Sequence, residues 1–109
     1  MSLSLPHTTE DILRADEHLV QSWADLDALK KPGARTAIVS AKGVMLQDSD
    51  GNDLIDGIGG LWCVNVGHGR QEIIDAISRQ LSTLDFYSTF YTFTHPTAAA
   101  LAQKLAQLA

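Results

Sequence analysis

Residues 57–69 constrain the fold more than any other part of this 109-residue chain. The segment reads Gly-Ile-Gly-Gly-Leu-Trp-Cys-Val-Asn-Val-Gly-His-Gly. Its five glycines permit positive φ and close approach of the backbone, which predicts a loop rather than a regular helix or strand. Loops usually lie on the surface, yet this one carries Leu61, Trp62, Val64 and Val66. These large apolar side chains must therefore be buried against something.

A second apolar loop is predicted at residues 85–94. It carries five of the seven aromatic residues of the chain: Phe86, Tyr87, Phe90, Tyr91 and Phe93. A domain of this length buries only about 60–65% of the surface of its unfolded chain, and such a small core is not expected to enclose both loops. We therefore expect that the apolar residues do not close one core among themselves. Two interpretations stay open: the aromatic side chains line an apolar pocket or a subunit interface, or they pack in the core, as we expect for Phe86.

The remaining pattern predicts an α+β segment. Residues 8–20 favour a helix with Thr8 as its N-cap, and Ile12, Ala15 and Leu19 recur at helical spacing. Three short runs, at residues 37–40, 44–48 and 54–56, predict a three-stranded antiparallel meander.

Two further helices are predicted after the meander. Residues 70–84 place Ile73, Ile77 and Leu81 on one helical stripe. The last helix opens at His95-Pro96, where proline is tolerated in the first turn. It reaches Ala109 without a stop signal, so we expect the chain to be a segment of a larger protein.

Composition excludes several classes of function. The formal net charge is −5 and no basic face is evident, which argues against a nucleic-acid binder. Apolar runs are too short to span a bilayer, and residues 1–10 lack the pattern of a signal peptide. A single cysteine is compatible with a reducing, cytoplasmic setting.

Local motifs favour structural interpretations over metal or nucleophile chemistry. Residues 48–53 resemble a calcium loop only superficially, since the glycine is displaced, and a hairpin turn is the better interpretation. His68 and His95 are expected to anchor loops by hydrogen bonds. Cys63 is expected to be a buried, unreactive thiol. The glycines around His68 give only a weak phosphate-binding signal.

Residues 50–70, with the run Leu-Trp-Cys-Val-Asn-Val-Gly at 61–67, closely resemble class III aminotransferases. They are most similar to the omega-transaminase group, which pairs amines or beta-alanine with pyruvate. Phe-Tyr-Ser-Thr-Phe at 86–90 and Thr-His-Pro at 94–96 resemble the same group. The match covers about residues 25–109. Aminomutases and decarboxylases of related fold are the alternatives within the enzyme class.

This resemblance implies the N-terminal part of a pyridoxal-phosphate-dependent enzyme of fold type I. Residues 1–24 would form an N-terminal helix and arm, residues 25–84 the small-domain meander, loop and helix, and residues 85–109 the aromatic loop and the start of the large domain. The active site would lie at a homodimer interface and take a small-molecule amine and a keto acid. The implied substrate-binding residues are Trp62, Trp23, Phe90 and Tyr91, with Phe90 reaching into the partner subunit's site.

The resemblance also shows which residues this segment lacks. An aminotransferase holds pyridoxal 5'-phosphate as a Schiff base on a lysine. None of the four lysines, Lys30, Lys31, Lys42 and Lys104, stands in the expected context. No catalytic, cofactor-binding or metal-binding residue is therefore assigned, and the isolated segment is expected to be inactive. The alternative is a non-catalytic truncated module that self-associates or binds a partner.

Overall fold

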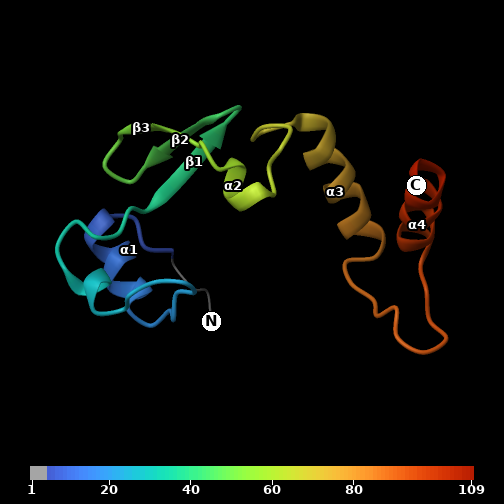
Figure 1. The fold of residues 1–109 in the computed structure, drawn as a ribbon, viewed down its shortest axis with the longest axis horizontal. Helices are drawn as coiled ribbons and strands as arrows, with labels where there is room; N and C mark the ends of the chain where they lie inside the picture. Colours follow the sequence, from blue (N-terminus) through green and yellow to red (C-terminus); the bar gives the residue numbers. More distant parts are fainter. Residues whose placement is uncertain (1–4) are drawn as a thin grey trace. The chain divides into compact units, whose positions relative to one another are not determined.

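A computed structural model describes residues 5–109, which form short helices and one small antiparallel sheet (Figure 1). Two compact units follow each other along the chain, Met1–Arg70 and Gln71–Ala109. The first contains α1 (Thr9–Asp16), the 3-10 helix η1 (Ala28–Lys30), three strands and the short α2 (Gly59–Trp62). The second contains α3 (Gln71–Thr83) and α4 (Pro96–Leu108). The α+β class predicted from the sequence is confirmed.

Helix α1 begins where the sequence predicts, because the Thr8 hydroxyl accepts a hydrogen bond from the Asp11 amide at 3.1 Å. The prediction that it reaches residue 20 is wrong, since the helix ends at Asp16. Its last amides bond three residues back rather than four, and the carboxylate of Asp16 binds Arg35 at 2.9 Å and Gln21 at 2.7 Å. These polar contacts hold the segment that follows the helix against its last turn.

The three strands form the predicted antiparallel meander in the order β1-β2-β3. They span Ile38–Lys42, Met45–Asp48 and Asp53–Ile55. The register places Ala41, Leu46 and Leu54 side by side across the sheet. One face of the sheet therefore carries an apolar row.

The turn between β2 and β3 is the predicted hairpin turn, and Asp48 organises it. Its Oδ1 accepts hydrogen bonds from the amides of Asp50 at 3.0 Å and Asn52 at 2.8 Å, and its Oδ2 accepts one from the Asn52 side chain at 2.9 Å. These bonds, led by the one from the Asn52 side chain, lower the pKa of the Asp48 carboxyl. Gly51 takes the positive φ of 86° that the turn needs.

The predicted loop at residues 57–69 contains one turn of unusual hand. All four residues of α2 have positive φ, with values of 56, 57, 58 and 66° from Gly59 to Trp62. The amide of Trp62 bonds the carbonyl of Ile58 at 2.8 Å, so the turn is closed. Left-handed helical geometry costs roughly 1–2 kcal/mol for each residue other than glycine. Leu61 and Trp62 are therefore held in strained backbone conformations.

The second unit ties the two ends of its aromatic loop together. The Thr97 hydroxyl donates to Gln80 at 2.8 Å, and Gln80 donates to the carbonyl of Leu84 at 2.9 Å. His95 caps α4, as its ring nitrogen accepts from the Ala98 amide at 3.3 Å. The expectation that His95 anchors a loop by hydrogen bonding is confirmed.

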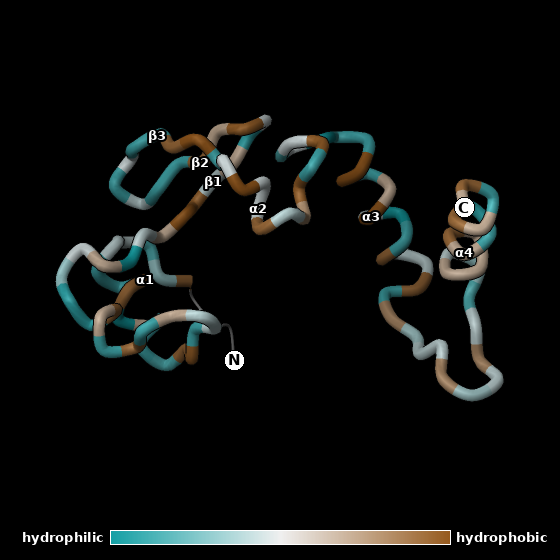
Figure 2. The backbone as a smooth tube through the Cα atoms, viewed as in Figure 1, coloured by the Kyte–Doolittle hydropathy of each residue, from teal (hydrophilic) through white to brown (hydrophobic). Residues whose placement is uncertain are grey.

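Residues 5–109 contain no buried hydrophobic side chain. Hydrophobic residues occur along the strands, α3 and α4 (Figure 2), and all of the stripe residues Ile73, Ile77 and Leu81 are exposed. The expectation that the apolar residues do not close one core is thus confirmed for the described residues. Their helices include none that is both long and apolar enough to cross a bilayer.

We expect the isolated chain to bind a hydrophobic dye such as ANS and to self-associate, because its apolar side chains lie open to water. Dye fluorescence and sedimentation velocity over a concentration series measure the two effects. A monomer at all concentrations that does not enhance dye fluorescence would contradict this expectation.

Replacement of Gly60 by alanine should open the left-handed turn. A Cβ at Gly60 would lie 2.6 Å from Cγ2 of Val64, at a φ of +57°. The strain of about 1–2 kcal/mol predicts that the Trp62 and Val64 amides exchange with solvent roughly 5–30 times faster. Gly57→Ala is the matched control, because a Cβ there meets no atom within 4 Å. Equal effects of the two substitutions would count against a specific requirement at Gly60.

Candidate substrate-facing loops

Trp62 lies at the end of the left-handed turn α2 with 78% of its surface exposed. The turn continues through bonds from the amides of Cys63 and Val64 to the carbonyl of Gly59, the second at 2.9 Å. The backbone around Trp62 is thus defined even though its ring is not enclosed. This is the arrangement expected of a side chain presented to something outside the unit.

Asp56 ties together the two ends of the loop that carries Trp62. Its Oδ2 accepts the amide of Gly60 at 2.8 Å and lies 2.8 Å from Nε2 of His68. The backbone of His68 in turn forms a two-bond bridge with Gly43, at 2.8 and 3.0 Å. The sequence-based expectation that His68 anchors a loop is confirmed.

The environment of Asp56 favours its ionised form. The side chain is only 5% exposed, yet hydrogen bonds from His68 and then from the Gly60 amide lower the pKa of its carboxyl below the ordinary value of 3.8. The Asp56 carboxylate is hidden from solvent, and its Oδ2 holds two groups of the loop in place.

Trp23 lies between α1 and η1, and its ring is fully exposed. The backbone at Trp23 also has a positive φ, of 59°. Among the described residues the paired aromatic rings are Tyr87–Phe93, which meet edge-on, and Phe90–Tyr91, which are tilted. The structure therefore places neither Trp23 nor Trp62 against another aromatic ring of the described chain.

Phe90 and Tyr91 lie together at the turn of the aromatic loop. Their ring centroids are 6.4 Å apart, and the Phe93 amide closes the turn on the Phe90 carbonyl at 3.2 Å. An edge-on contact of Tyr87 with Phe93, at 5.4 Å, braces the loop below the turn. Phe90 and Tyr91 are 75% and 97% exposed.

Strained backbone coincides with the predicted site residues. The described residues other than glycine that have positive φ are Trp23, Leu61, Trp62 and Tyr91. Three of these four were predicted as substrate-binding residues from the sequence resemblance, and the fourth is adjacent to one of them. Left-handed backbone at bulky residues is uncommon and clusters at functional sites. This coincidence supports a functional role for the two loops.

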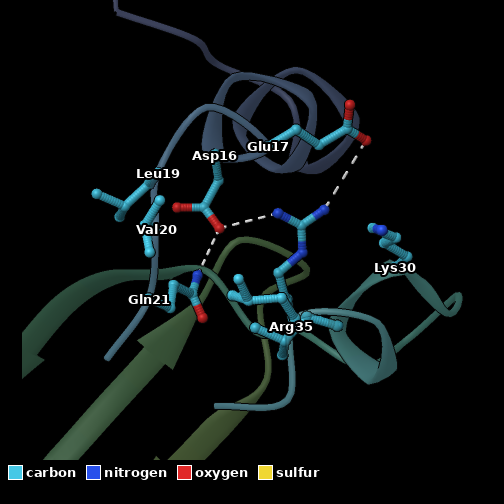
Figure 3. A pocket seen from close by; sticks show the side chains of 9 residues that line it. Asp16, Glu17, Leu19, Val20, Gln21, Lys30 and Arg35 are labelled. Carbon is cyan, nitrogen blue, oxygen red and sulfur yellow. Dashed lines mark hydrogen bonds and ion pairs between the residues drawn. The ribbon is translucent and has the colours of Figure 1, made fainter. Parts of the chain in front are cut away.

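A cavity of about 480 Å³ lies elsewhere in the first unit, between the end of α1 and η1 (Figure 3). Neither Trp23 nor Trp62 lines it. Its charged groups are all paired: Asp16 binds Arg35 at 2.9 Å, and Arg35 lies 4.0 Å from Glu17. Lys30, which also lines the cavity, is paired with Asp27 at 2.7 Å. These contacts fix the chain after α1 and leave the cavity without a group poised for chemistry.

Cys63 corrects the expectation of a buried thiol. It is exposed, with its Sγ 3.4 Å from the carbonyl of Leu61. The thiol lies open because residues 5–109 enclose no hydrophobic side chain, and the neighbouring Trp62 is itself exposed. Within residues 5–109, no three His, Cys, Asp or Glu side chains come close enough to hold a metal ion.

The lysines of the segment do not fit a Schiff-base site for pyridoxal phosphate. Lys30 is paired with Asp27 at 2.7 Å on the exposed surface of η1. Lys31, Lys42 and Lys104 are likewise exposed. A Schiff-base lysine has to be held in a pocket that excludes water, and none of the four is.

Asp56 is the loop-organising residue that sequence reasoning missed. It was predicted only as the end of the third strand. A usable signal was present, since an aspartate directly precedes the glycine-rich loop and a histidine closes it.

The loop should loosen in acid because of Asp56. A lowered pKa means that the carboxylate stabilises the folded loop above the ordinary value of 3.8 and that this stabilisation is lost as the pH falls through the lowered pKa. The Gly60 amide chemical shift, followed by NMR, should therefore titrate below pH 3.8. The urea-unfolded chain supplies the reference. A midpoint at or above that of the unfolded chain would contradict the assignment.

Comparison with known proteins identifies the family. Residues 28–109 match the family model described as aminotransferase class-III. The chain is 43% identical over 97 residues to a putrescine–pyruvate aminotransferase of Pseudomonas aeruginosa, covering 89% of this chain and 21% of that protein. It is 38% identical over 108 residues to a beta-alanine–pyruvate aminotransferase of the same species, covering 99% of this chain and 23% of that protein.

Solved structures agree with the sequence comparison. A thermostable (S)-enantioselective omega-transaminase from Thermomicrobium roseum matches with a TM-score of 0.86 and 32% identity, covering 93% of this chain and 23% of that one. The chain thus spans about a fifth of the length of the curated relatives it matches. With its family match and these relatives, the chain belongs to the class III aminotransferases.

Proposed function

We propose that these residues form the N-terminal part of a pyridoxal-phosphate-dependent aminotransferase. The enzyme would move an amino group from an amine or omega-amino acid to a keto acid such as pyruvate. The family match over residues 28–109 carries this proposal. It is supported by two relatives that are named as pyruvate aminotransferases and by the transaminase fold.

The segment's own contribution is to shape the substrate pocket and to exclude water from it. Exposed aromatic side chains at Trp62, Trp23, Phe90 and Tyr91 would form walls once the remainder of the enzyme and a second subunit cover them. Such walls select substrates by the shape of their apolar substituents and exclude water from the reacting groups. The lysine that carries the cofactor is proposed to be none of the four lysines here, so the isolated chain is proposed to be inactive.

A homodimer with the active site at the subunit interface fits this role. The aromatic loop ends in a fixed turn, and Phe90 and Tyr91 project from it without burial in the described unit. A partner subunit would supply the missing contacts. A cytoplasmic location remains part of the proposal.

A chimera tests the proposal directly. Residues 28–109 would replace the matched segment of the Pseudomonas aeruginosa putrescine–pyruvate aminotransferase. We expect the chimera to bind pyridoxal phosphate and to transfer amino groups to pyruvate, whereas the purified 109-residue chain does neither. A chimera that binds the cofactor but turns over no amine would contradict the proposal, and so would turnover by the isolated chain.

Replacement of Trp62 should change the choice of amine. In the chimera we expect Trp62→Ala to raise kcat/KM for a branched aromatic amine about tenfold relative to a short linear diamine, since differences of a few buried carbon atoms change discrimination by at least that factor. Trp62→Phe keeps an aromatic wall and should shift the ratio much less. An unchanged ratio in Trp62→Ala would remove Trp62 from the substrate pocket.

A non-catalytic module that self-associates is the second candidate. The absence of a buried hydrophobic side chain in residues 5–109 favours it for the isolated chain. The oligomeric state of the purified chain, measured by sedimentation, has to be combined with the activity of the chimera to separate the two candidates. A defined oligomer combined with an inactive chimera would favour the module.

A further inference from the structure

We propose that Asp56 is a positioning residue that sets the orientation of Trp62, and through it the size of amine accepted, by holding the left-handed turn α2 in place together with His68. The inference rests on the proposed function for its link to the amine. Its structural part concerns only residues 56–68 and stands on the contacts within them.

Asp56 caps the left-handed turn at its start. The amide of Gly59 faces the backbone carbonyl of Asp56 at 3.4 Å, and the next amide, that of Gly60, donates to the Asp56 side chain at 2.8 Å. The following bonds, from Trp62 to Ile58 and from Val64 to Gly59, belong to the turn itself. Asp56 therefore satisfies the first donors of a turn that ends at Trp62, as an N-cap does for a right-handed helix.

A carboxylate suits this task because the turn is strained. Leu61 and Trp62 have φ values of 58 and 66°, and side chains other than glycine persist there only when surrounding contacts hold them. Hydrogen bonds to an ionised acceptor are roughly twice as strong as bonds between neutral groups. One oxygen of Asp56 takes two such bonds, and its side chain is 95% hidden from solvent.

Asp56 and His68, which together brace the left-handed turn, are both hydrogen-bonded to the β1–β2 hairpin. The amide of Asp56 bonds the carbonyl of Val44 at 2.8 Å, directly after β3. His68 forms its two-bond bridge with Gly43 in the same hairpin turn. The Val64 side chain lies against Gly60, since a Cβ built there would be 2.6 Å from Cγ2 of Val64. These contacts fix the position of Trp62 relative to the β1–β2 hairpin.

The experiment has a structural arm that requires no activity. Amide hydrogen exchange of the chimeric enzyme would be compared among Asp56→Ala, Asp56→Asn and Asp53→Ala. Asn keeps an oxygen that can accept both donors but lacks the charge, and Asp53 is an exposed strand residue three positions away. We expect Trp62 and Val64 to exchange about tenfold faster in Asp56→Ala, with a smaller increase in Asp56→Asn and no change in Asp53→Ala.

The kinetic arm uses the same variants in the chimeric enzyme. A displaced Trp62 should reduce discrimination between a short linear diamine and a branched aromatic amine by about tenfold, since a misplacement of 1 Å can cost up to a hundredfold. The ratio of kcat/KM values per cofactor-loaded subunit is the readout. A residue needed only for folding would lower the amount of loaded enzyme and leave that ratio unchanged, and Asp56→Asn should restore part of the discrimination.

The outcomes separate the inference from the proposed function. Unchanged exchange at Trp62 and Val64 in Asp56→Ala would overturn the inference whether or not the chimera is active. Faster exchange with an unchanged ratio, in a chimera where Trp62→Ala does alter it, would overturn the link to amine size. An inactive parent chimera would count against the proposed function, and the exchange data would still decide the role of Asp56 in the turn.

Discussion

Carboxylates that bind backbone and side-chain donors, rather than a buried apolar core, hold the first unit in its conformation. Asp48 closes the β2–β3 turn, Asp56 closes the loop after β3, and Asp16 binds Arg35 across the chain. A further polar link runs from Thr9 on α1 to Ser49 at 2.8 Å. Because such bonds fix local geometry without enclosing apolar surface, the unit has defined turns together with exposed large side chains.

A backbone that is fixed while its large side chains stay exposed suits a segment that completes a site together with other surfaces. Strain needs rigid support, and the support is local: the Asp56 brace lies beside Leu61 and Trp62, and the Tyr87–Phe93 pair lies beside Tyr91. The aromatic rings themselves remain uncovered. Binding surfaces that are held in place before a partner arrives lose less conformational freedom on association. A backbone that is already fixed therefore lowers the entropic cost of burying the aromatic rings afterwards.

The sequence predicted those features that depend on short-range patterns. Alternating β-branched runs and the Asp-Gly turn located all three strands within two residues, and His95-Pro96 located the start of α4. It failed where side chains distant in sequence decide the outcome. Helix α1 stops at Asp16, where the following amides bond three residues back and the carboxylate binds Arg35, nineteen residues later. Periodicity through Leu19 carried no sign of that contact.

The handedness of α2 shows a deeper limit of pattern reading. Glycines at 59 and 60 permit positive φ, but nothing in the composition says that Leu61 and Trp62 must follow them into it. That outcome requires a donor-rich turn, an acceptor at Asp56, and a Cβ-free position under Val64, all present at once. Each is unremarkable as a residue type, and only their coincidence in space outweighs the preference of bulky residues for negative φ. Family resemblance could name Trp62 as a pocket residue, whereas the physical reason for its presentation lies in the backbone hydrogen bonds around it.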